Sequence, residues 1–435
     1  MLQFRTEKWQ CVHRLWVLGR QNESVSNDGN LHQPEPGLHE MLSQSEHRTL
    51  NPAEADYFFM PIYVRCLTSF IYAADFPVFH GGPFAPRTHA ATNMFIGAHH
   101  WLKTHLPYWE RNGGRDHILV AVHDEGSCWV PSVLRPAIHL VHWGRTDVPH
   151  TSESGYAPDN YSINATHPVW QPEGHFAKLQ QDKYPCYDPS KDLVIPMMHS
   201  PTKYKQSPFL GGPERNRTML AFFKGRIQPD NPKYSRGTRQ FLANISQAED
   251  WWGKHRIWIG ETAPPGHKGL YTDFLAQSTF CLALMGDGWT ARFEDGLMNG
   301  CIPVIIIDNV QLTWHSIMDL DAYSLRVAQK DMARLPEILK AVPPKDVARM
   351  QANIRKVWRR HLWTSYRPYG EVARQLIQSR QNEPASQARS DIDFGQDDAF
   401  STIIQWLYAR VDDLGAHAPT RGSPRRNEVH SVDQR

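Results

Sequence analysis

The chain has 435 residues, which is long for one hydrophobic core and sufficient for two domains of ordinary size. Apolar residues make up 40% of it and aromatic residues 11%, which is typical of a globular protein and excludes a wholly disordered one. The formal net charge of +2 gives no strong field that would attract nucleic acid or an anionic membrane. The longest apolar runs hold about seven residues, whereas a membrane-spanning helix needs about 20, so we expect no spanning segment.

The cysteines and histidines show no metal-ligand spacing, and we expect no metal site. The six cysteines are widely separated, and their number is compatible with disulfides in a secretory compartment or with buried thiols. They are Cys11, Cys66, Cys128, Cys186, Cys281 and Cys301. Five Asn-x-Ser/Thr sequences are potential glycosylation sites, although such triplets also arise by chance. They begin at Asn22, Asn160, Asn164, Asn216 and Asn244.

The first half of the chain predicts an α/β arrangement. Residues 1–36 are polar and poorly periodic, so we expect them to be poorly ordered. Apolar patterning then predicts a helix at 39–43, a strand at 57–60, a helix at 93–106, strands at 118–122 and 138–141, and a short strand before Pro196. A turn-rich stretch over 145–185 is interpreted as a surface insertion. His123, Asp124 and Glu125 follow a predicted strand, at the end where open α/β sheets bind ligands.

The second half repeats the alternation of strands and helices after a linker rich in proline and glycine at 202–216. The predicted elements are a strand at 219–223, a helix at 234–246, a strand at 256–259, a helix at 270–277, strands at 280–284, 302–307 and 324–327, and helices at 332–341, 345–362 and 399–411. The polar segment 380–393 and the tail from residue 415 are expected to be disordered.

One stretch, 278–308, has the form of a βαβ unit: an apolar strand, a glycine-bearing loop, a short helix and a second apolar strand. Thr290 is the expected N-cap of the helix and Gly300 its C′ residue. Arg292 lies in the first turn, where the helix dipole disfavours a cation by about 0.3–1 kcal/mol. A bound anion removes that cost.

Gly286 and Gly288 would let a diphosphate approach the backbone there, with Arg292 as a planar donor. Glu294 and Asp295 would accept hydrogen bonds from a ribose diol. In the alternative, both carboxylates complement the helix dipole and one of them pairs with Arg292.

Two further cations, Lys224 and Arg226, flank a glycine at the end of the predicted strand 219–223. This placement suits a phosphate group, and a solvated turn is the alternative. The Asp319-Leu-Asp321 string is interpreted as a chance match to a metal-binding motif, because it follows no suitable strand.

The pattern of the βαβ unit resembles the donor-binding signature of the exostosin family, glycosyltransferase family 47. The matching residues are Ser278-x-Phe280-Cys281-Leu282 and Gly286-Asp-Gly-Trp289-x-x-Arg292-x-x-Asp295-Gly-Leu-x-x-Gly300-Cys-Ile-Pro-Val304. The strand Gly114-Arg-Asp-His117, with His123-Asp124 and Gly126 after it, and the segment Cys186 to Pro196 are similar to the family as well. The resemblance covers roughly residues 38–412.

The resemblance implies a GT-B fold, with two Rossmann-like domains facing each other across a cleft. It also implies inverting transfer of a sugar from a nucleotide sugar, mostly UDP-linked, to a glycan or glycoprotein, without a tightly held metal or cofactor. In such proteins a carboxylate three residues after the arginine binds the ribose, which is Asp295 here, with Glu294 as second choice. The family's arginine after the strand, here Arg226, contacts the diphosphate.

For the catalytic base we expect His123 or Asp124, with Glu125 behind them. A structural role as a loop cap is the alternative for each. We also consider a second function, that of a non-catalytic exostosin-like partner that stabilises another glycosyltransferase. The partners implied are the nucleotide sugar, the acceptor and other glycosyltransferases or a second copy of the chain, with no nucleic acid. The family implies the Golgi, and an N-terminal anchor typical of it is not visible, so we expect an incomplete N-terminus.

The expected organisation follows from the resemblance and the composition together. It comprises a poorly ordered segment 1–36, an N-terminal acceptor-side domain 37–201, a linker 202–216, a nucleotide-sugar-binding domain 217–378, a disordered segment 379–396, a C-terminal helix 397–413 and a disordered tail 414–435.

Overall fold

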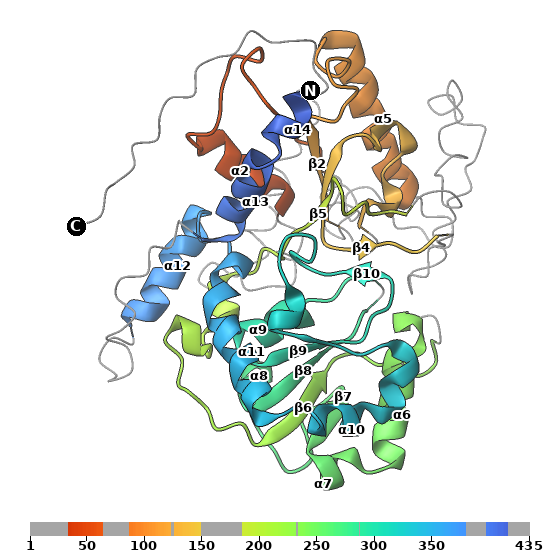
Figure 1. Ribbon diagram of the computed structural model, residues 1–435, viewed down its shortest axis with the longest axis vertical. Coiled ribbons are helices and arrows are strands. Elements are labelled where there is room, and N and C mark those ends of the chain that lie inside the picture. The colour runs from red at the N-terminus through yellow and green to blue at the C-terminus, as the bar shows by residue number, and fades with distance from the viewer. Residues whose placement is uncertain are drawn as a thin grey trace.

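A computed structural model of the chain shows a mixed α/β fold with two parallel sheets and one antiparallel pair of strands (Figure 1). It describes residues 34–63, 87–122, 126–148, 185–231, 234–286, 288–379 and 397–415. The expectations for 1–33, for most of the 145–185 insertion, for 380–393 and for the tail after 415 lie outside the described residues. The α/β class predicted from the sequence is confirmed.

The N-terminal sheet has four parallel strands in the order β1-β2-β3-β5. Its strands are β1 (Phe58–Phe59), β2 (His117–Ala121), β3 (Ile138–Val141) and β5 (Leu193–Val194). Side chains of β2 alternate between two cores: Leu119 packs with helix α5 (Arg87–His105) on one face, and Ile118 packs with helices α2 (Pro34–Gln44) and α13 (Ala399–Tyr408) on the other. Both faces are therefore covered, as parallel sheets require.

The C-terminal sheet has five parallel strands in the order β11-β9-β8-β6-β7. They are β6 (Met219–Lys224), β7 (Ile257–Gly260), β8 (Ser278–Ala283), β9 (Ile302–Ile305) and β11 (Leu325–Arg326). The first of these strands in the chain, β6, lies inside the sheet, with β7 on one side and β8 on the other. The chain thus leaves β6 and β8 in opposite directions, and ligands of open α/β sheets bind at this switch point.

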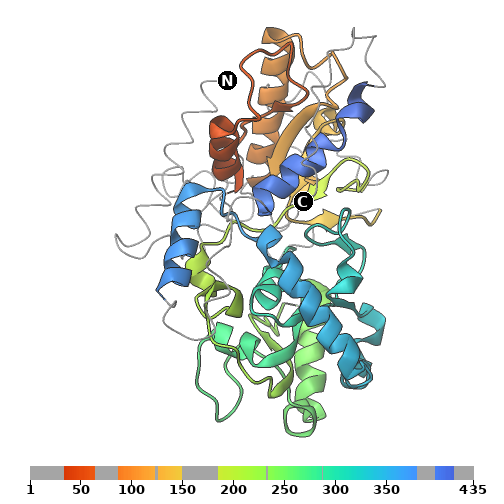
Figure 2. The same ribbon diagram turned by 60° about the vertical axis from the view of Figure 1, so that its left-hand side comes forward.

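Helices surround the C-terminal sheet, as Figure 2 shows from a second direction. They are α6 (Thr238–Ala248), α7 (Trp251–His255), α8 (Tyr271–Ala276), α9 (Arg292–Met298), α10 (Leu335–Lys340) and α11 (Pro344–Val357). Helix α12 (Arg367–Gln378) packs against the segment that connects the two sheets, at Pro201–Tyr204 and Pro208–Leu210. Helix α14 (Val411–Gly415) ends the described chain. Short 3-10 turns lie at Gly126–Trp129, Ser132–Leu134, Pro201–Tyr204, Pro208–Leu210, Tyr234–Gly237, Leu320–Ala322, Gln329–Arg334 and Trp358–His361.

The predicted strands and helices are present, with ends that differ by a few residues. The helix expected over 332–341 starts as a 3-10 turn and becomes α10, and the helix expected over 345–362 ends at Val357. The sequence analysis did not predict α7, α12 or the pairing of β4 (Gly144–Arg145) with β10 (Val310–Gln311). The unpredicted pairing links a segment that follows β3 with one that follows β9.

The last helix packs against the N-terminal sheet although it follows the C-terminal one in sequence. Ile403 and Leu407 of α13, four residues apart on one helical face, lie in the same core as Leu38 and Ile118. The Tyr57 hydroxyl donates a hydrogen bond to the Leu407 carbonyl at 2.8 Å.

Four cysteines form two disulfides, Cys128–Cys186 and Cys281–Cys301. Of the two possibilities that the cysteine count left open, the disulfide is the correct one for these four. Cys11 and Cys66 lie outside the described residues.

Candidate functional site

A cavity of about 370 Å³ opens where the strand order of the C-terminal sheet reverses. Its walls come from the ends of β6 and β7 and from helices α8 and α9. The lining residues are Lys224, Gly225, Arg226, Glu261, Tyr271, Arg292 and Asp295. Four of the seven are residues that the sequence analysis selected for nucleotide binding, from two segments about 70 residues apart in the chain. They meet because β6 and β8 are neighbours.

Arg292 is the first residue of α9, and its guanidinium lies against the backbone of Gly225. A β-carbon on Gly225 would be 2.5 Å from Arg292 Nη2, so only glycine leaves room for the arginine. The Arg292 Cζ atom is 5.2 Å from the centre of the Phe223 ring. Its Nε is buried and has no hydrogen-bond partner among the described residues. Among the described residues Arg292 forms no ion pair with Glu294 or Asp295. Such a pair was expected in the alternative interpretation, in which Arg292 serves the helix and not a ligand.

Helix α9 is short, with seven residues, and begins one residue later than the sequence predicted. Ala291, not Thr290, occupies the N-cap position, and the helix start has no side-chain cap within the described part of the chain. The Thr290 hydroxyl still accepts a bond from the Arg292 N–H at 3.4 Å. Thr290 is therefore not the N-cap that the sequence predicted, because it lies two residues before the first helical residue, Arg292.

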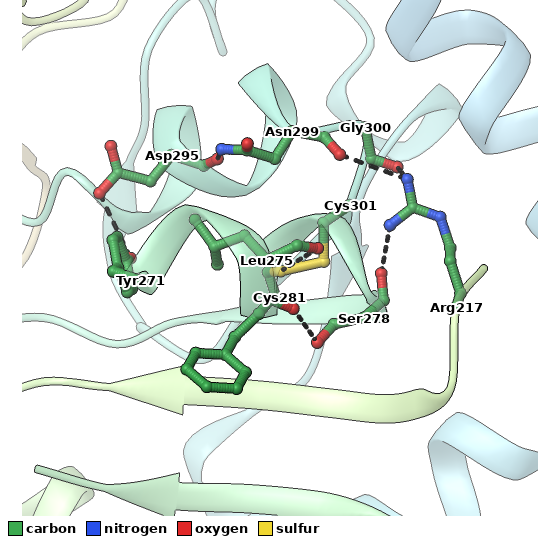
Figure 3. Close-up of a disulfide and its surroundings, with 10 residues drawn as sticks. Arg217, Tyr271, Leu275, Ser278, Cys281, Asp295, Asn299, Gly300 and Cys301 are labelled. Carbon is green, nitrogen blue, oxygen red and sulfur yellow. Dashed lines mark hydrogen bonds between the residues drawn. A yellow bond between two sulfur atoms is a disulfide. The ribbon is translucent and has the colours of Figure 1, made fainter. Parts of the chain in front are cut away.

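The C-terminal end of α9 matches the prediction. Gly300 has φ +65, the left-handed conformation that favours glycine. Its N–H donates to Leu297 O at 2.9 Å and the Cys301 N–H donates to Gly296 O at 3.0 Å, which is the Schellman pattern. Arg217 donates to the Gly300 carbonyl at 2.6 Å (Figure 3). This cation beside the carbonyl end complements the helix dipole.

Asp295 is buried, with 4% of its surface exposed, and three side chains of the described residues contact its carboxylate. Lys203 Nζ is 2.7 Å from Oδ1, and the Tyr204 hydroxyl donates to the same oxygen at 3.2 Å. The Tyr271 hydroxyl donates to Oδ2 at 3.3 Å (Figure 3). Burial, together with the Asp295 charge, raises the pKa of both tyrosines, so they remain neutral donors.

Glu294 lies next to Asp295 in sequence, but it is not among the described residues that line the cavity. The Thr313 hydroxyl donates to its Oε1, while Oε2 is buried and has no partner in the described part of the chain. Burial raises the pKa of Glu294 to about 7. The structure therefore brings Asp295, and not Glu294, to the wall of the cavity.

Lys224 and Arg226 both line the cavity, one partly buried and the other exposed. Neither side chain forms an ion pair or hydrogen bond with another described residue. Arg239 fixes the turn that carries them: its guanidinium donates to Arg226 O at 2.9 Å and to Leu284 O at 3.1 Å. Because Leu284 directly follows β8, this buried arginine ties together the ends of the two strands that flank the switch point.

Gly286 and Gly288 are buried in the loop between β8 and α9, and neither belongs to the described lining of the cavity. The Gly286 carbonyl accepts a bond from the Ser235 N–H at 3.1 Å. A β-carbon on Gly286 would be 3.4 Å from Trp289 O and 3.5 Å from Arg239 Nη2. These are ordinary van der Waals distances, so the packing of this loop does not by itself require a glycine at position 286.

The sequence analysis missed three residues of the site. Glu261 directly follows β7, and the placement at a strand end that selected Arg226 would also have selected Glu261. Its carboxylate accepts a bond from the Ile227 N–H. Tyr271, at the start of α8, and Lys203, in the Pro201–Tyr204 turn, carry no local sequence signal. They reach Asp295 only through tertiary packing.

The candidates for a catalytic base, His123, Asp124 and Glu125, lie outside the described residues. The end of the neighbouring strand, β3, belongs to the described residues. His142 follows β3, and the centre of its ring is 5.6 Å from the centre of the Trp289 ring in the loop before α9. The carboxyl end of the N-terminal sheet therefore touches the loop that leads to Arg292.

Within the described segments, no group of three or more His, Cys, Asp or Glu side chains could hold a metal ion. Asp319 instead caps a 3-10 turn by accepting from the Asp321 N–H at 3.1 Å. None of the helices in these segments is both long and apolar enough to cross a membrane.

Comparison with known proteins identifies the chain's relatives. The family model of the Exostosin GT47 domain matches residues 7–342, more than half of the chain. A probable glucuronoxylan glucuronosyltransferase of Arabidopsis thaliana is 28% identical over 329 residues, which cover 74% of this chain and 60% of that protein. A probable glucuronosyltransferase of Oryza sativa subsp. japonica is 28% identical over 322 residues, covering 74% and 65%.

A second probable glucuronoxylan glucuronosyltransferase of Arabidopsis thaliana is 26% identical over 349 residues, which cover 77% of this chain and 66% of that protein. The chain thus spans between 60% and 66% of the length of these three curated relatives.

Proposed function

Because the chain belongs to the exostosin GT47 family, we propose that it is an inverting glycosyltransferase that transfers a sugar from a UDP-linked donor to a glycan or glycoprotein. The names of the relatives favour glucuronic acid as the sugar and a polysaccharide as the acceptor. We further propose the GT-B arrangement, with residues 37–201 on the acceptor side and residues 217–378 binding the nucleotide sugar.

One observation carries the proposal: the guanidinium of Arg292 lies at the switch point of a parallel sheet, in a cavity that also contains Lys224 and Arg226. The cavity lining holds three cations and two carboxylates, and one of these carboxylates, Asp295, is already paired with Lys203. The surplus of positive charge suits a diphosphate. A planar guanidinium binds phosphate oxygens through two parallel hydrogen bonds.

In the proposed reaction, an acceptor hydroxyl oxygen attacks the anomeric carbon as the bond from that carbon to the diphosphate oxygen breaks. Negative charge develops on the departing UDP, and Arg226, Arg292 and Lys224 stabilise it from fixed positions. We propose that these side chains carry this charge without a resident metal ion or other tightly bound cofactor. Asp295 accepts a hydrogen bond from the ribose, with Glu294 as second choice.

The acceptor proton passes to a base on the opposite side, for which His123 and Asp124 remain our candidates. The loop of Gly286 and Gly288 is proposed to shape the diphosphate side of the site. The His142–Trp289 contact supports a site between the two sheets, because it joins the end of β3 to the loop before α9.

We propose the Golgi as the compartment. The two disulfides are typical of an oxidising, secretory environment. Two of the potential glycosylation sites, Asn216 and Asn244, are exposed. Assembly with a second copy or with another glycosyltransferase is part of the proposal, as in the expectation from the family.

The test is UDP release from a panel of UDP-sugars, including UDP-glucuronic acid, with xylan and other glycan acceptors. We expect release from one donor and its loss in the Arg292→Ala variant. Arg334→Ala is the matched control, because that side chain is 67% exposed and lies outside the cavity lining. Binding of UDP without turnover of any donor would instead support the non-catalytic partner function.

A further inference from the structure

We infer that Lys203 is a positioning residue for the donor's ribose, holding the carboxylate of Asp295 in its binding orientation from the segment that connects the two sheets. The inference rests on the proposed function, because it gives Asp295 the ribose. It adds a residue that neither the local sequence nor the cavity lining identifies. Lys203 acts through Asp295 and does not itself line the cavity among the described residues.

The Lys203 ammonium is held between two buried groups. Its Nζ is 2.7 Å from Asp295 Oδ1 and 2.8 Å from His199 Nε2. The side chains of Lys203 and Asp295 are 26% and 6% exposed, so solvent screens the pair only weakly. An ammonium can only donate, so His199 accepts at Nε2 and is neutral. Burial has the largest effect on the pKa of His199 and lowers it, and the charges of Lys203 and His142 lower it further. A low pKa agrees with a neutral ring.

The arrangement uses part of the hydrogen-bonding capacity of Asp295 and leaves part of it open. An ionised carboxylate has about four acceptor sites. Among the described residues, Lys203 and Tyr204 bind Oδ1, and Tyr271 is the one donor to Oδ2. Oδ2 therefore keeps one acceptor site for a ribose hydroxyl, and Tyr271 and Asp295 both line the cavity. Lys203 binds the other oxygen, Oδ1, and thereby holds the carboxylate so that Oδ2 is left for the ribose.

Lys203 lies in the segment of the chain that connects the two sheets. It belongs to the turn Pro201–Tyr204, whose start is capped by the Ser200 hydroxyl accepting from the Thr202 N–H at 3.3 Å. This turn lies between β5 of the N-terminal sheet and β6 of the C-terminal sheet. The ion pair therefore fixes the connecting segment to α9, the helix that carries both Arg292 and Asp295.

The experiment compares the affinities of UDP and 2′,3′-dideoxy-UDP, which lacks the ribose diol, by titration calorimetry. Wild-type protein should bind UDP more tightly, and Asp295→Asn should lose that preference. We expect Lys203→Met to weaken UDP binding about tenfold while the affinity for dideoxy-UDP stays unchanged. Lys203→Arg should restore the preference, because it keeps the charge. In a double variant with Asp295→Asn, the Lys203→Met effect should disappear, since residues that act through each other are not additive.

Lys205→Met is the matched control, because this lysine is two residues further along and exposed. The inference is overturned if Lys203→Met weakens both nucleotides equally, which indicates a purely structural role, or if it leaves the preference for UDP intact. Lys203→Gln provides a second variant that keeps a neutral donor, and it must also reduce the preference. If wild-type protein binds UDP and dideoxy-UDP equally, the ribose role of Asp295 and this inference fail while the diphosphate site stands. If it binds neither nucleotide, the proposed function fails and the inference with it.

Discussion

The guanidinium of Arg292 occupies the space that a side chain at Gly225 would need, with Nη2 2.5 Å from the position of the missing β-carbon. The two residues lie on the segments that follow neighbouring strands, β8 and β6. The contact thus couples the turn that carries Lys224 and Arg226 to the first residue of α9.

The first prediction follows from this contact. Gly225→Ala should push the Arg292 guanidinium out of place and weaken UDP binding about tenfold, a loss of about 1.4 kcal/mol. The atoms that must move are the far end of a flexible side chain, so the melting temperature should change little. Gly269→Ala is the control, because its β-carbon would meet neighbours at ordinary distances of 3.4 Å or more. Unchanged UDP affinity in Gly225→Ala would contradict the account.

The second prediction concerns stability and pH. Burial raises the pKa of Glu294 from 4.5 to about 7. Between these values the folded chain keeps a proton that the unfolded chain releases, so this group makes the free energy of unfolding fall as pH rises. Glu294→Gln removes the effect and retains a hydrogen-bonding oxygen for Thr313. Relative to wild type, the variant should therefore gain stability between about pH 5 and pH 8, by about 1.4 kcal/mol for each unit of the pKa difference.

Urea unfolding at the two pH values measures this gain. Glu337→Gln serves as the control, since that carboxylate is 73% exposed. A Glu294→Gln variant whose stability relative to wild type is the same at both pH values would show that Glu294 is ionised normally.

The third prediction concerns the Cys281–Cys301 disulfide, which joins β8 to the residue directly before β9 (Figure 3). The bond closes a loop with a sequence separation of 20, and that of Cys128–Cys186 is 58. In the chain-entropy account, loops of these sizes correspond to about 3 and about 4 kcal/mol. Replacing both cysteines of a pair by alanine should lower the free energy of unfolding by these amounts. Equal stability of wild type and the double alanine variants would refute this role.

Much of the C-terminal sheet could be predicted from local patterns, because its strands are continuous apolar runs with glycine or charge at their ends. The end of helix α9 was predictable too, since the left-handed conformation at Gly300 requires glycine or a close substitute. Lys224 and Arg226 were predicted from their place at a strand end, and Arg292 and Asp295 from their place in the first turn of the next helix and from the family resemblance; the structure brings all four to one cavity.

The remaining parts depend on contacts between distant segments. Lys203 is 92 positions from Asp295 in the chain, and the sequence around either residue does not predict their ion pair. The β4–β10 pairing joins Gly144 to Gln311 with only two residues in each strand, too short for a periodic signal. Helix α9 began later than expected because Thr290 resembles an N-cap in sequence although the chain bends into the helix one residue further on.

Calorimetric titration of UDP and of uridine into wild-type protein and the Arg292→Ala variant tests the central claim most directly. A charged hydrogen bond contributes about 1.5–3 kcal/mol, so Arg292→Ala should weaken UDP binding by at least about tenfold. The affinity for uridine, which has no phosphate, should not change, and Arg334→Ala should bind both ligands like wild type. Equal affinity of wild type and Arg292→Ala for UDP would contradict a diphosphate site at the switch point.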